Sequence, residues 1–313
     1  MANPDDQKKA GTVDATHDNP SLTSAAPLSQ DLTGTWFISD LHLHAGAPEV
    51  CSAMWQFFSD LSDQATEHPN SIAELYLLGD LFEAWVGDDD SEPLSMEFAT
   101  YCAHLASLGV HIFIQHGNRD FLIGEGFAKR CKAILLPETH VALIENKKTL
   151  LMHGDELCTD DVQYQRLRAQ LRSKHWRQEF LAQDISIRKI QAEKYREAST
   201  AAQADKPQSI MDVNDETTMH FMRQNEVTRL IHGHTHRPAI HRYTAQGDTP
   251  FRIRCVLGDW SEDAFALHQH KGQIALKKWP LTGSVRNAIR EDYQPWTHSS
   301  ARERVSPFVT TDQ

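Results

Sequence analysis

The chain has 313 residues, of which 40% are apolar, so it can build a sizeable core in one large domain or two ordinary ones. Its formal net charge of −12 argues against general nucleic-acid binding, which requires a cationic surface. Five cysteines at irregular spacing, with no Cys-x-x-Cys pair, indicate neither a disulfide framework nor a thiolate zinc site and are typical of a reducing cytoplasm.

We expect neither a membrane span nor a secretory signal. No apolar run approaches the roughly 18–20 residues that a spanning helix needs. Residues 1–33 have few large apolar side chains and many Asp, Ser, Thr, Asn and Pro residues. This composition predicts a disordered N-terminal tail without an apolar signal segment.

A single domain over 34–282 is predicted to follow the tail. It begins with the apolar run Trp36–Ile38, which is typical of a buried strand. Helical and strand-like patterns then alternate, with helices predicted at 49–66 and 93–108 and strands at 75–78 and 111–115. This β-α-β-α-β order indicates an α/β fold with at least partly parallel strands.

A helical insertion, at about 157–210, is predicted to interrupt the strand pattern. Between Val162 and Lys206 there are ten Lys or Arg residues and five Asp or Glu residues, a cationic stretch in an acidic protein. Around it the sequence predicts a hairpin at 141–144 and 149–152, a helix at 212–225, and strands at 229–231, 252–256 and 274–278. Residues 283–313 lose periodicity and predict a C-terminal tail.

Five strand-like runs end in the same kind of loop, which contains Asp, Asn or His and in four cases an adjacent Gly. A lone Asp-x-His such as Asp40-Leu-His42 is more often an ordinary polar loop, but core packing does not explain five such loops in sequence. The loops supply seven candidate metal ligands: Asp40, His42, Asp80, Asn118, His153, His234 and His236. Two further histidines, His44 and His232, are expected to be structural or solvent-facing.

Seven oxygen and nitrogen donors are too many for one tetrahedral site and suit two ions with five or six ligands each. A carboxylate can bridge two metals about 3.5–4 Å apart, and Asp80 is the natural bridge. Mixed carboxylate, amide and imidazole ligands suit Mn²⁺, Fe²⁺ or Zn²⁺, and the residues alone do not choose among these.

In this order, from Thr35 to Trp260, the motifs resemble those of the calcineurin-like metallophosphoesterases. The resemblance implies two β-sheets packed face to face with helices outside, an αββα sandwich, here with a helical insertion. It also implies one ion held by Asp40, His42, Asp80 and His236, and a second held by Asp80, Asn118, His153 and His234. Such paired cations polarise phosphate oxygens and lower the pKa of a bound water, which then attacks phosphorus.

The chain departs from many members of that family at Arg119, where they have a His that assists the leaving group. An Arg stays cationic and can bind phosphate oxygens with two N–H groups, but it is a poor proton donor. We therefore expect Arg119 to stabilise charge on a diphosphate. The catalytic residues implied are Asn118, Arg119 and His234.

Longer matches resemble the UDP-2,3-diacylglucosamine diphosphatase family of Gram-negative lipid A biosynthesis; they lie at 37–43, 79–89, 116–122, 153–161, 210–214 and 232–238. This resemblance implies hydrolysis to 2,3-diacylglucosamine 1-phosphate (lipid X) and UMP with two Mn²⁺ ions. It implies a peripheral protein on the cytoplasmic face of the inner membrane, with no obligate protein partner. The substrate-binding residues implied are Asn118, Arg119, Asp161, Tyr164, Arg196, Ser199, Gln203, Lys206 and His234, although the familiar residue at the position of Gln203 is Asn.

The insertion suits such a substrate, because two acyl chains and a diphosphate require an apolar groove beside cationic groups. The alternative is a solvated helical pair that caps the core. Two alternative functions also stay open. Another phosphodiesterase or pyrophosphatase of this fold would prefer a soluble ester, and a non-catalytic scaffold would have lost metal ligands.

Overall fold

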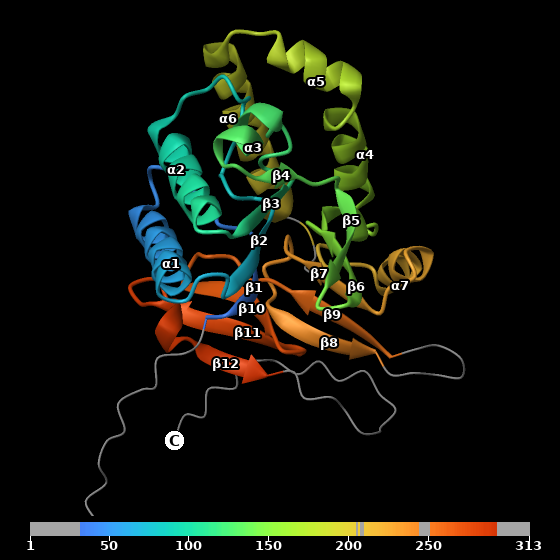
Figure 1. Cartoon of the computed structure of the whole chain (residues 1–313). Coiled ribbons are helices and arrows are strands. Elements are labelled where there is room, and N and C mark those ends of the chain that lie inside the picture. The colour runs from blue at the N-terminus through green and yellow to red at the C-terminus, as the bar shows by residue number, and fades with distance from the viewer. Residues whose placement is uncertain (1–31, 205, 207–209, 244–250, 293–313) are drawn as a thin grey trace, which may run out of the picture.

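The computed structural model describes residues 32–204, 206, 210–243 and 251–292, in which two mixed β-sheets pack face to face (Figure 1). One sheet has seven strands in the order β12 (Ile289–Asp292), β11 (Gln273–Pro280), β10 (Asp263–His270), β1 (Gly34–Ile38), β2 (Ile72–Leu78), β3 (His111–Gln115) and β4 (Ile134–Leu135). The other has five, in the order β5 (Thr139–Ile144), β6 (Lys147–Met152), β7 (Arg229–His232), β9 (Arg252–Val256) and β8 (Ala239–Tyr243).

Parallel pairing at the centre of each sheet places the carboxyl ends of the strands at one edge. In the first sheet β1 pairs with β2, and β2 pairs with β3, all parallel. In the second sheet β7 pairs in parallel with β6 and with β9. The loops that follow these strands therefore start from neighbouring positions, as the sequence predicted.

Alternation along β1 builds two layers of core from consecutive residues. Phe37 faces the second sheet, where its ring stacks on Tyr76 at 5.0 Å between centroids and packs among residues of β6, β7 and β9. Trp36 and Ile38 point the other way, toward the helices. This period of two is what a strand buried on both faces requires.

Helices cover the outer face of each sheet, which confirms the expected αββα sandwich. The helices α1 (Pro48–Glu67), α2 (Pro93–Ser107) and α3 (Glu125–Arg130) pack on the first sheet through a cluster that includes Phe57, Phe98 and Phe127. On the second sheet lies α7 (Asp215–Gln224), whose buried Met222 packs against residues of β6 and β7.

The predicted insertion consists of three helices, α4 (Val162–Leu171), α5 (Lys174–Leu181) and α6 (Ile185–Ala204), preceded by the short 3₁₀-helix η1 (Asp155–Leu157). They form the upper part of the molecule in Figure 1. Trp176 and Phe180 of α5 and Ala192 of α6 join the cluster on the first sheet, so the insertion packs on the main domain. None of the helices within the described ranges is long and apolar enough to cross a lipid bilayer.

Both predicted domain boundaries need correction. Past residue 282 the chain forms the 3₁₀-helix η2 (Val285–Asn287), in which Val285 is fully buried, and then β12, which pairs with β11. These residues contain too few apolar side chains to show a period. At the other end, Leu32 is also fully buried and accepts a hydrogen bond from the Trp36 indole. The rest of both predicted tails lies outside the described residues.

Candidate metal centre

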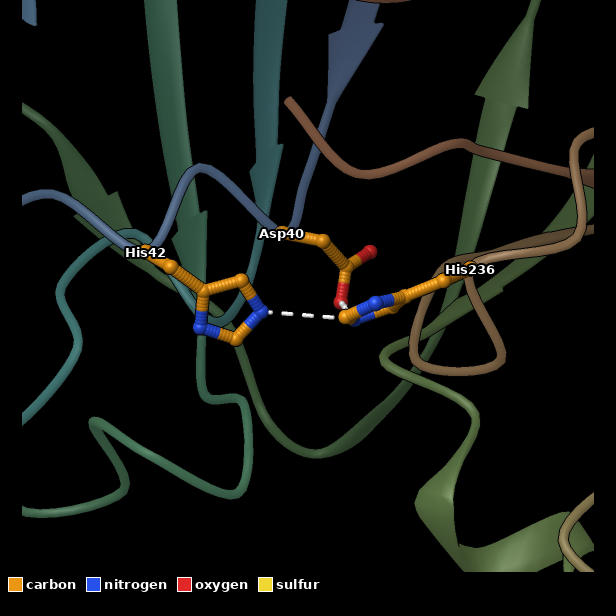
Figure 2. Close-up of side chains that lie close together, drawn as sticks. All are labelled: Asp40, His42 and His236. Carbon is orange, nitrogen blue, oxygen red and sulfur yellow. Dashed lines mark hydrogen bonds and ion pairs between the residues drawn. The ribbon is translucent and has the colours of Figure 1, made fainter. Parts of the chain in front are cut away.

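The seven predicted ligands come together from five loops at the carboxyl ends of strands. One group contains Asp40, His42 and His236 (Figure 2). Here Nε2 of His236 lies 3.4 Å from Oδ1 of Asp40 and 3.3 Å from Nε2 of His42. The three side chains present one oxygen and two nitrogen donors to a common point.

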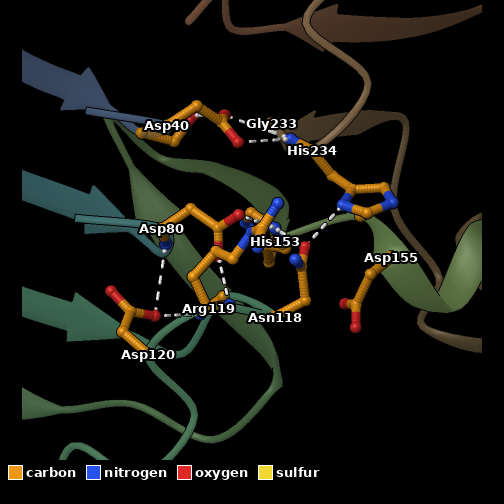
Figure 3. Close-up of polar contacts among 12 residues, drawn as sticks. Asp40, Asp80, Asn118, Arg119, Asp120, His153, Asp155, Gly233 and His234 are labelled. Carbon is orange, nitrogen blue, oxygen red and sulfur yellow. Dashed lines mark hydrogen bonds and ion pairs between the residues drawn. The ribbon is translucent and has the colours of Figure 1, made fainter. Parts of the chain in front are cut away.

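A second group lies beside it and contains Asp80, Asn118, His153 and His234 (Figure 3). The amide oxygen of Asn118 lies 3.0 Å from Nε2 of His153 and 2.7 Å from Nδ1 of His234. Asp80 stands between the groups, because its Oδ2 is 3.7 Å from Nε2 of His153 and 3.8 Å from Nε2 of His42. This position is the one that a bridging carboxylate requires.

The loops that carry these ligands have an unusual backbone. Five of the seven have a positive φ, a conformation that side chains other than Gly rarely adopt: Asp40 (55°), His42 (47°), Asp80 (51°), His234 (68°) and His236 (52°). Such strain collects at functional sites, where the surrounding fold holds it. Gly117 is also needed, since a Cβ there would lie 2.1 Å from Oδ1 of Asp80.

Hydrogen bonds from the surrounding chain orient the ligands. Nδ1 of His153 lies 2.9 Å from the carbonyl oxygen of Leu78, which leaves Nε2 free to face the centre. Asp40 accepts from the Ser39 hydroxyl and, at 3.1 Å, from the backbone N–H of His234. Asp40 and Asp80 are almost completely buried, so the orientation of both carboxylates is fixed before any ion binds.

The electrostatics of the centre favour cations. Burial by itself would lower the pKa of His42, but its hydrogen bond with Glu83 and the charges of Asp80 and Asp40 raise it to about 9. The pKa of His153 is also raised, against the effect of burial, by Asp80 and Asp40. By contrast, burial and the charge of His153 lower the pKa of His234 to about 4.

These residues fit a pair of divalent metal ions. Two buried carboxylates, Asp40 and Asp80, require compensating positive charge, and their ion-pair partners within 4 Å in the described chain are histidines that are themselves candidate ligands. The donors are oxygen and nitrogen, without a thiolate, so they suit Mn²⁺, Fe²⁺ or Zn²⁺.

Two cavities meet at this centre. The larger has a volume of about 440 Å³, and seven of the predicted substrate residues line it: Asn118, Arg119, Asp161, Tyr164, Ser199, Lys206 and His234. The smaller, of about 120 Å³, is lined mainly by apolar groups such as Leu171, Trp176 and Phe180 under the insertion. Arg196 borders it, as do Asn118 and Arg119. Gln203 lies in α6, and its side chain is outside the described part of the chain.

Three acidic residues of the site had no predicted role. Asp120 is fully buried and accepts from the backbone N–H groups of Asp80, Leu81 and Gly117, at 2.7–3.2 Å, so it fixes two ligand loops together. Glu83 lies 3.2 Å from Nδ1 of His42. No signal distinguished these carboxylates from surface ones in the sequence.

The third acidic residue without a predicted role is Asp155, which attaches the insertion to the metal loops. Its Oδ2 accepts from the Tyr164 hydroxyl at 2.9 Å, from Nε of Arg168 at 2.7 Å and from Nη2 of Arg172 at 3.2 Å. Arg172 also donates to the carbonyl of Gly117, at 3.0 Å. Helix α4 therefore has a fixed position relative to the ligands His153 and Asn118.

The two extra histidines are placed as expected. His44 is exposed. His232 is fully buried; its Nδ1 lies 2.8 Å from the carbonyl of Gly233, and its Nε2 accepts from Arg254 at 3.2 Å. Both ring nitrogens of His232 are therefore engaged, which is a structural arrangement.

The model of the calcineurin-like phosphoesterase family matches residues 34–238, and the chain belongs to that family. The chain is also similar in sequence to curated relatives over nearly their whole length. The chain is 42% identical over 247 residues to UDP-2,3-diacylglucosamine hydrolase of Cellvibrio japonicus, covering 79% of this chain and 99% of the relative. It is 43% identical over 248 residues to the protein of that name from Marinobacter nauticus, with 79% and 98% covered, and 41% identical over 247 residues to that from Salmonella typhi, with 79% and 99% covered.

Proposed function

We propose that this protein hydrolyses the diphosphate bond of UDP-2,3-diacylglucosamine to lipid X and UMP, a step of lipid A biosynthesis. The observation that carries the proposal is the meeting of two unlike cavities at Asn118 and Arg119. One is the more polar and is lined by five of the seven candidate metal ligands, and the other is mainly apolar. A substrate with a diphosphate and acyl chains has the chemistry of both. The names of the relatives support the same substrate.

We propose two Mn²⁺ ions as cofactors. Asp40, His42 and His236 would hold one ion, Asn118, His153 and His234 the other, and Asp80 would bridge them. When bound, the ions supply Lewis acidity and a water of lowered pKa. The protein contributes the buried carboxylates that attract the ions and the hydrogen bonds that orient each ligand.

Arg119 is proposed to bind the diphosphate oxygens beside the ions. Arg119 lines both cavities, and its backbone N–H donates to Oδ1 of Asp80 at 2.7 Å. Asn118 and His234 face the same reacting phosphate. Attack at the UMP-side phosphorus makes lipid X the leaving group through its 1-phosphate oxygen. A phosphate needs little protonation, so an Arg can stand where other members have a His.

The insertion is proposed to hold the lipid half of the substrate. Asp161 and Lys206 pair at 2.5 Å on the wall of the polar cavity, where Tyr164 and Ser199 also lie, and these groups can contact the sugar. The acyl chains would enter the apolar cavity beside Trp176 and Phe180. Exposed Ile187 and Ile190, near basic residues of α6, would favour peripheral contact with an anionic inner membrane on its cytoplasmic face.

The test is release of UMP from the diacylated UDP-sugar with and without Mn²⁺. We expect Mn²⁺-dependent release that is faster than hydrolysis of the soluble ester bis(p-nitrophenyl) phosphate. Faster turnover of the soluble ester would instead favour a general phosphodiesterase. A protein that binds no metal in excess Mn²⁺ and releases no UMP would be a scaffold.

A further inference from the structure

Glu83 lies where the metal centre meets the predicted phosphate-binding arginines. Its Oε2 is 3.2 Å from Nδ1 of His42. Its Oε1 is 3.8 Å from Nη1 of Arg119 and 3.9 Å from Nη1 of Arg196. One half-buried carboxylate therefore contacts a metal ligand, a loop arginine and an arginine of the insertion.

The contact with His42 involves the ring nitrogen on the side away from Asp40 and His236 (Figure 2). A carboxylate in that position keeps the proton on Nδ1, leaves Nε2 free for a metal and makes the ring a stronger ligand. The backbone supports this geometry, because Glu83 N–H donates to the carbonyl of Leu43 at 3.2 Å, next to His42.

The contacts with the arginines are of a different kind. Among the described residues, Glu83 is the only acidic side chain within 4.0 Å of either guanidinium. Both distances are long for an ion pair, and both arginines line a cavity next to the centre. Such pairs are weak enough for a phosphate to replace the carboxylate, yet they keep two flexible side chains near the place where the phosphate binds.

The geometry points to Glu83 as a positioning residue that orients His42 for the metal and holds Arg119 and Arg196 beside the centre until a phosphate takes its place. This inference rests on the proposed function, because it requires the two arginines to bind substrate phosphates. It has an unusual consequence: neutralising Glu83 strengthens the binding of a simple anion while it weakens catalysis.

The experiment compares the Mn²⁺-loaded wild type with Glu83→Gln and Glu83→Ala, with inorganic phosphate as the probe in a calorimetric titration. In Glu83→Gln we expect phosphate to bind roughly 3–10 times more tightly, the range for one or two part-exposed ion pairs. Metal content should stay unchanged, since a Gln oxygen at the same place can accept the Nδ1 proton of His42, 3.2 Å from the present carboxylate. The kcat for the lipid nucleotide should fall, because the arginines lose their alignment.

Glu83→Ala should also lower the affinity for the ion held by His42, which direct Mn²⁺ titration measures. Glu97→Gln removes the same charge from the exposed face of α2 and is the matched control. It should change neither the affinity for phosphate nor the affinity for Mn²⁺. Unchanged or weaker phosphate binding in Glu83→Gln would overturn the inference. So would tighter phosphate binding with undiminished kcat, since that is the effect of a nearby charge without positioning.

The experiment distinguishes a failure of the proposed function from a failure of the role inferred for Glu83. If wild type releases no UMP from the diacylated UDP-sugar but phosphate binds more tightly to Glu83→Gln, the substrate is wrong and the kcat comparison moves to bis(p-nitrophenyl) phosphate. If wild type is active and the phosphate affinity does not change, the role of Glu83 is wrong and the substrate stands.

Discussion

The side-chain oxygen of Asn118 lies 2.7 Å from Nδ1 of His234, although 116 residues separate the two in sequence. Asn118 follows β3 of the first sheet, and His234 follows β7 of the second. The contact therefore crosses the interface between the sheets. The metal centre depends on the packing of both sheets, and its geometry reports whether they are correctly assembled.

Asp80→Ala tests the bridge between the two groups. We expect metal content to fall at both positions and the rate of UMP release to drop by more than about 100-fold, since even outer partners of metal ligands contribute 10–100-fold. Metal per chain by mass spectrometry and UMP release measure the two effects. Asp63→Ala, on the exposed face of α1, is the control. Two ions per chain with substantial activity in Asp80→Ala would exclude bridging.

The convergence of these ligands was predictable because it follows from strand order. Alternating strands and helices imply parallel pairing, parallel pairing aligns the carboxyl ends, and ligand-type residues followed each end. The hairpin was also predictable, but its turn is tighter than expected. Glu145 and Asn146 both have positive φ, so two residues make the turn and not the whole polar run 145–148.

Arg119→Ala tests whether the cationic side chain acts on the substrate. We expect kcat to fall about 10²–10³-fold, as for loss of one donor to developing charge. Metal content should stay unchanged, because the contact of residue 119 with Asp80 uses the backbone N–H and survives the substitution. Arg119→Lys is the matched variant and should recover part of the rate. Loss of metal in Arg119→Ala would place the side chain in the metal site.

Asp155→Asn tests the attachment of the insertion. The Asp155 carboxylate is buried and contacts Tyr164, Arg168 and Arg172, and breaking a buried network of this kind costs roughly 3–5 kcal/mol. We expect a lower Tm and a higher KM for the lipid nucleotide, since α4 forms a wall of both cavities. Hydrolysis of bis(p-nitrophenyl) phosphate, which does not need the insertion, should change much less. An equal loss on both substrates would mean that Asp155 acts on the metal centre.

One central strand was not predicted from the sequence, and the reason is physical. The strand β10 lies in the middle of the first sheet, yet it contains His268, Gln269 and His270, which hide its apolar pattern. His268 is accommodated because its ring stacks on Trp36 at 4.2 Å and contacts the carbonyl of Thr33 at 2.8 Å. Partners such as these come from distant residues, so no local window contains them.

A pH series tests the ion pairs of Glu138. Burial alone would raise its pKa, but Arg172 and Arg168 lower it below the ordinary value of 4.5. The pairs therefore stabilise the fold above that value, and their contribution is lost as the pH falls through the lowered pKa. We expect Glu138→Gln to have a lower Tm than wild type at neutral pH and a difference that shrinks as the pH drops below about 4.5. A difference independent of pH would indicate lost packing instead, and Glu97→Gln should show none at any pH.

Removal of metal should destabilise the protein, because Asp40 and Asp80 would stay buried without compensating charge. After chelation we expect added Mn²⁺ to raise the Tm, with a gain of about 2.7 kcal/mol in the free energy of unfolding when the free ion is at 100 times its Kd. Mg²⁺ should raise the Tm less at the same concentration, since four of the seven ligands are imidazoles, which prefer transition metals. Asp80→Ala should show little rise with either ion. An equal response of wild type and Asp80→Ala would mean that the stabilising ions bind elsewhere on the protein.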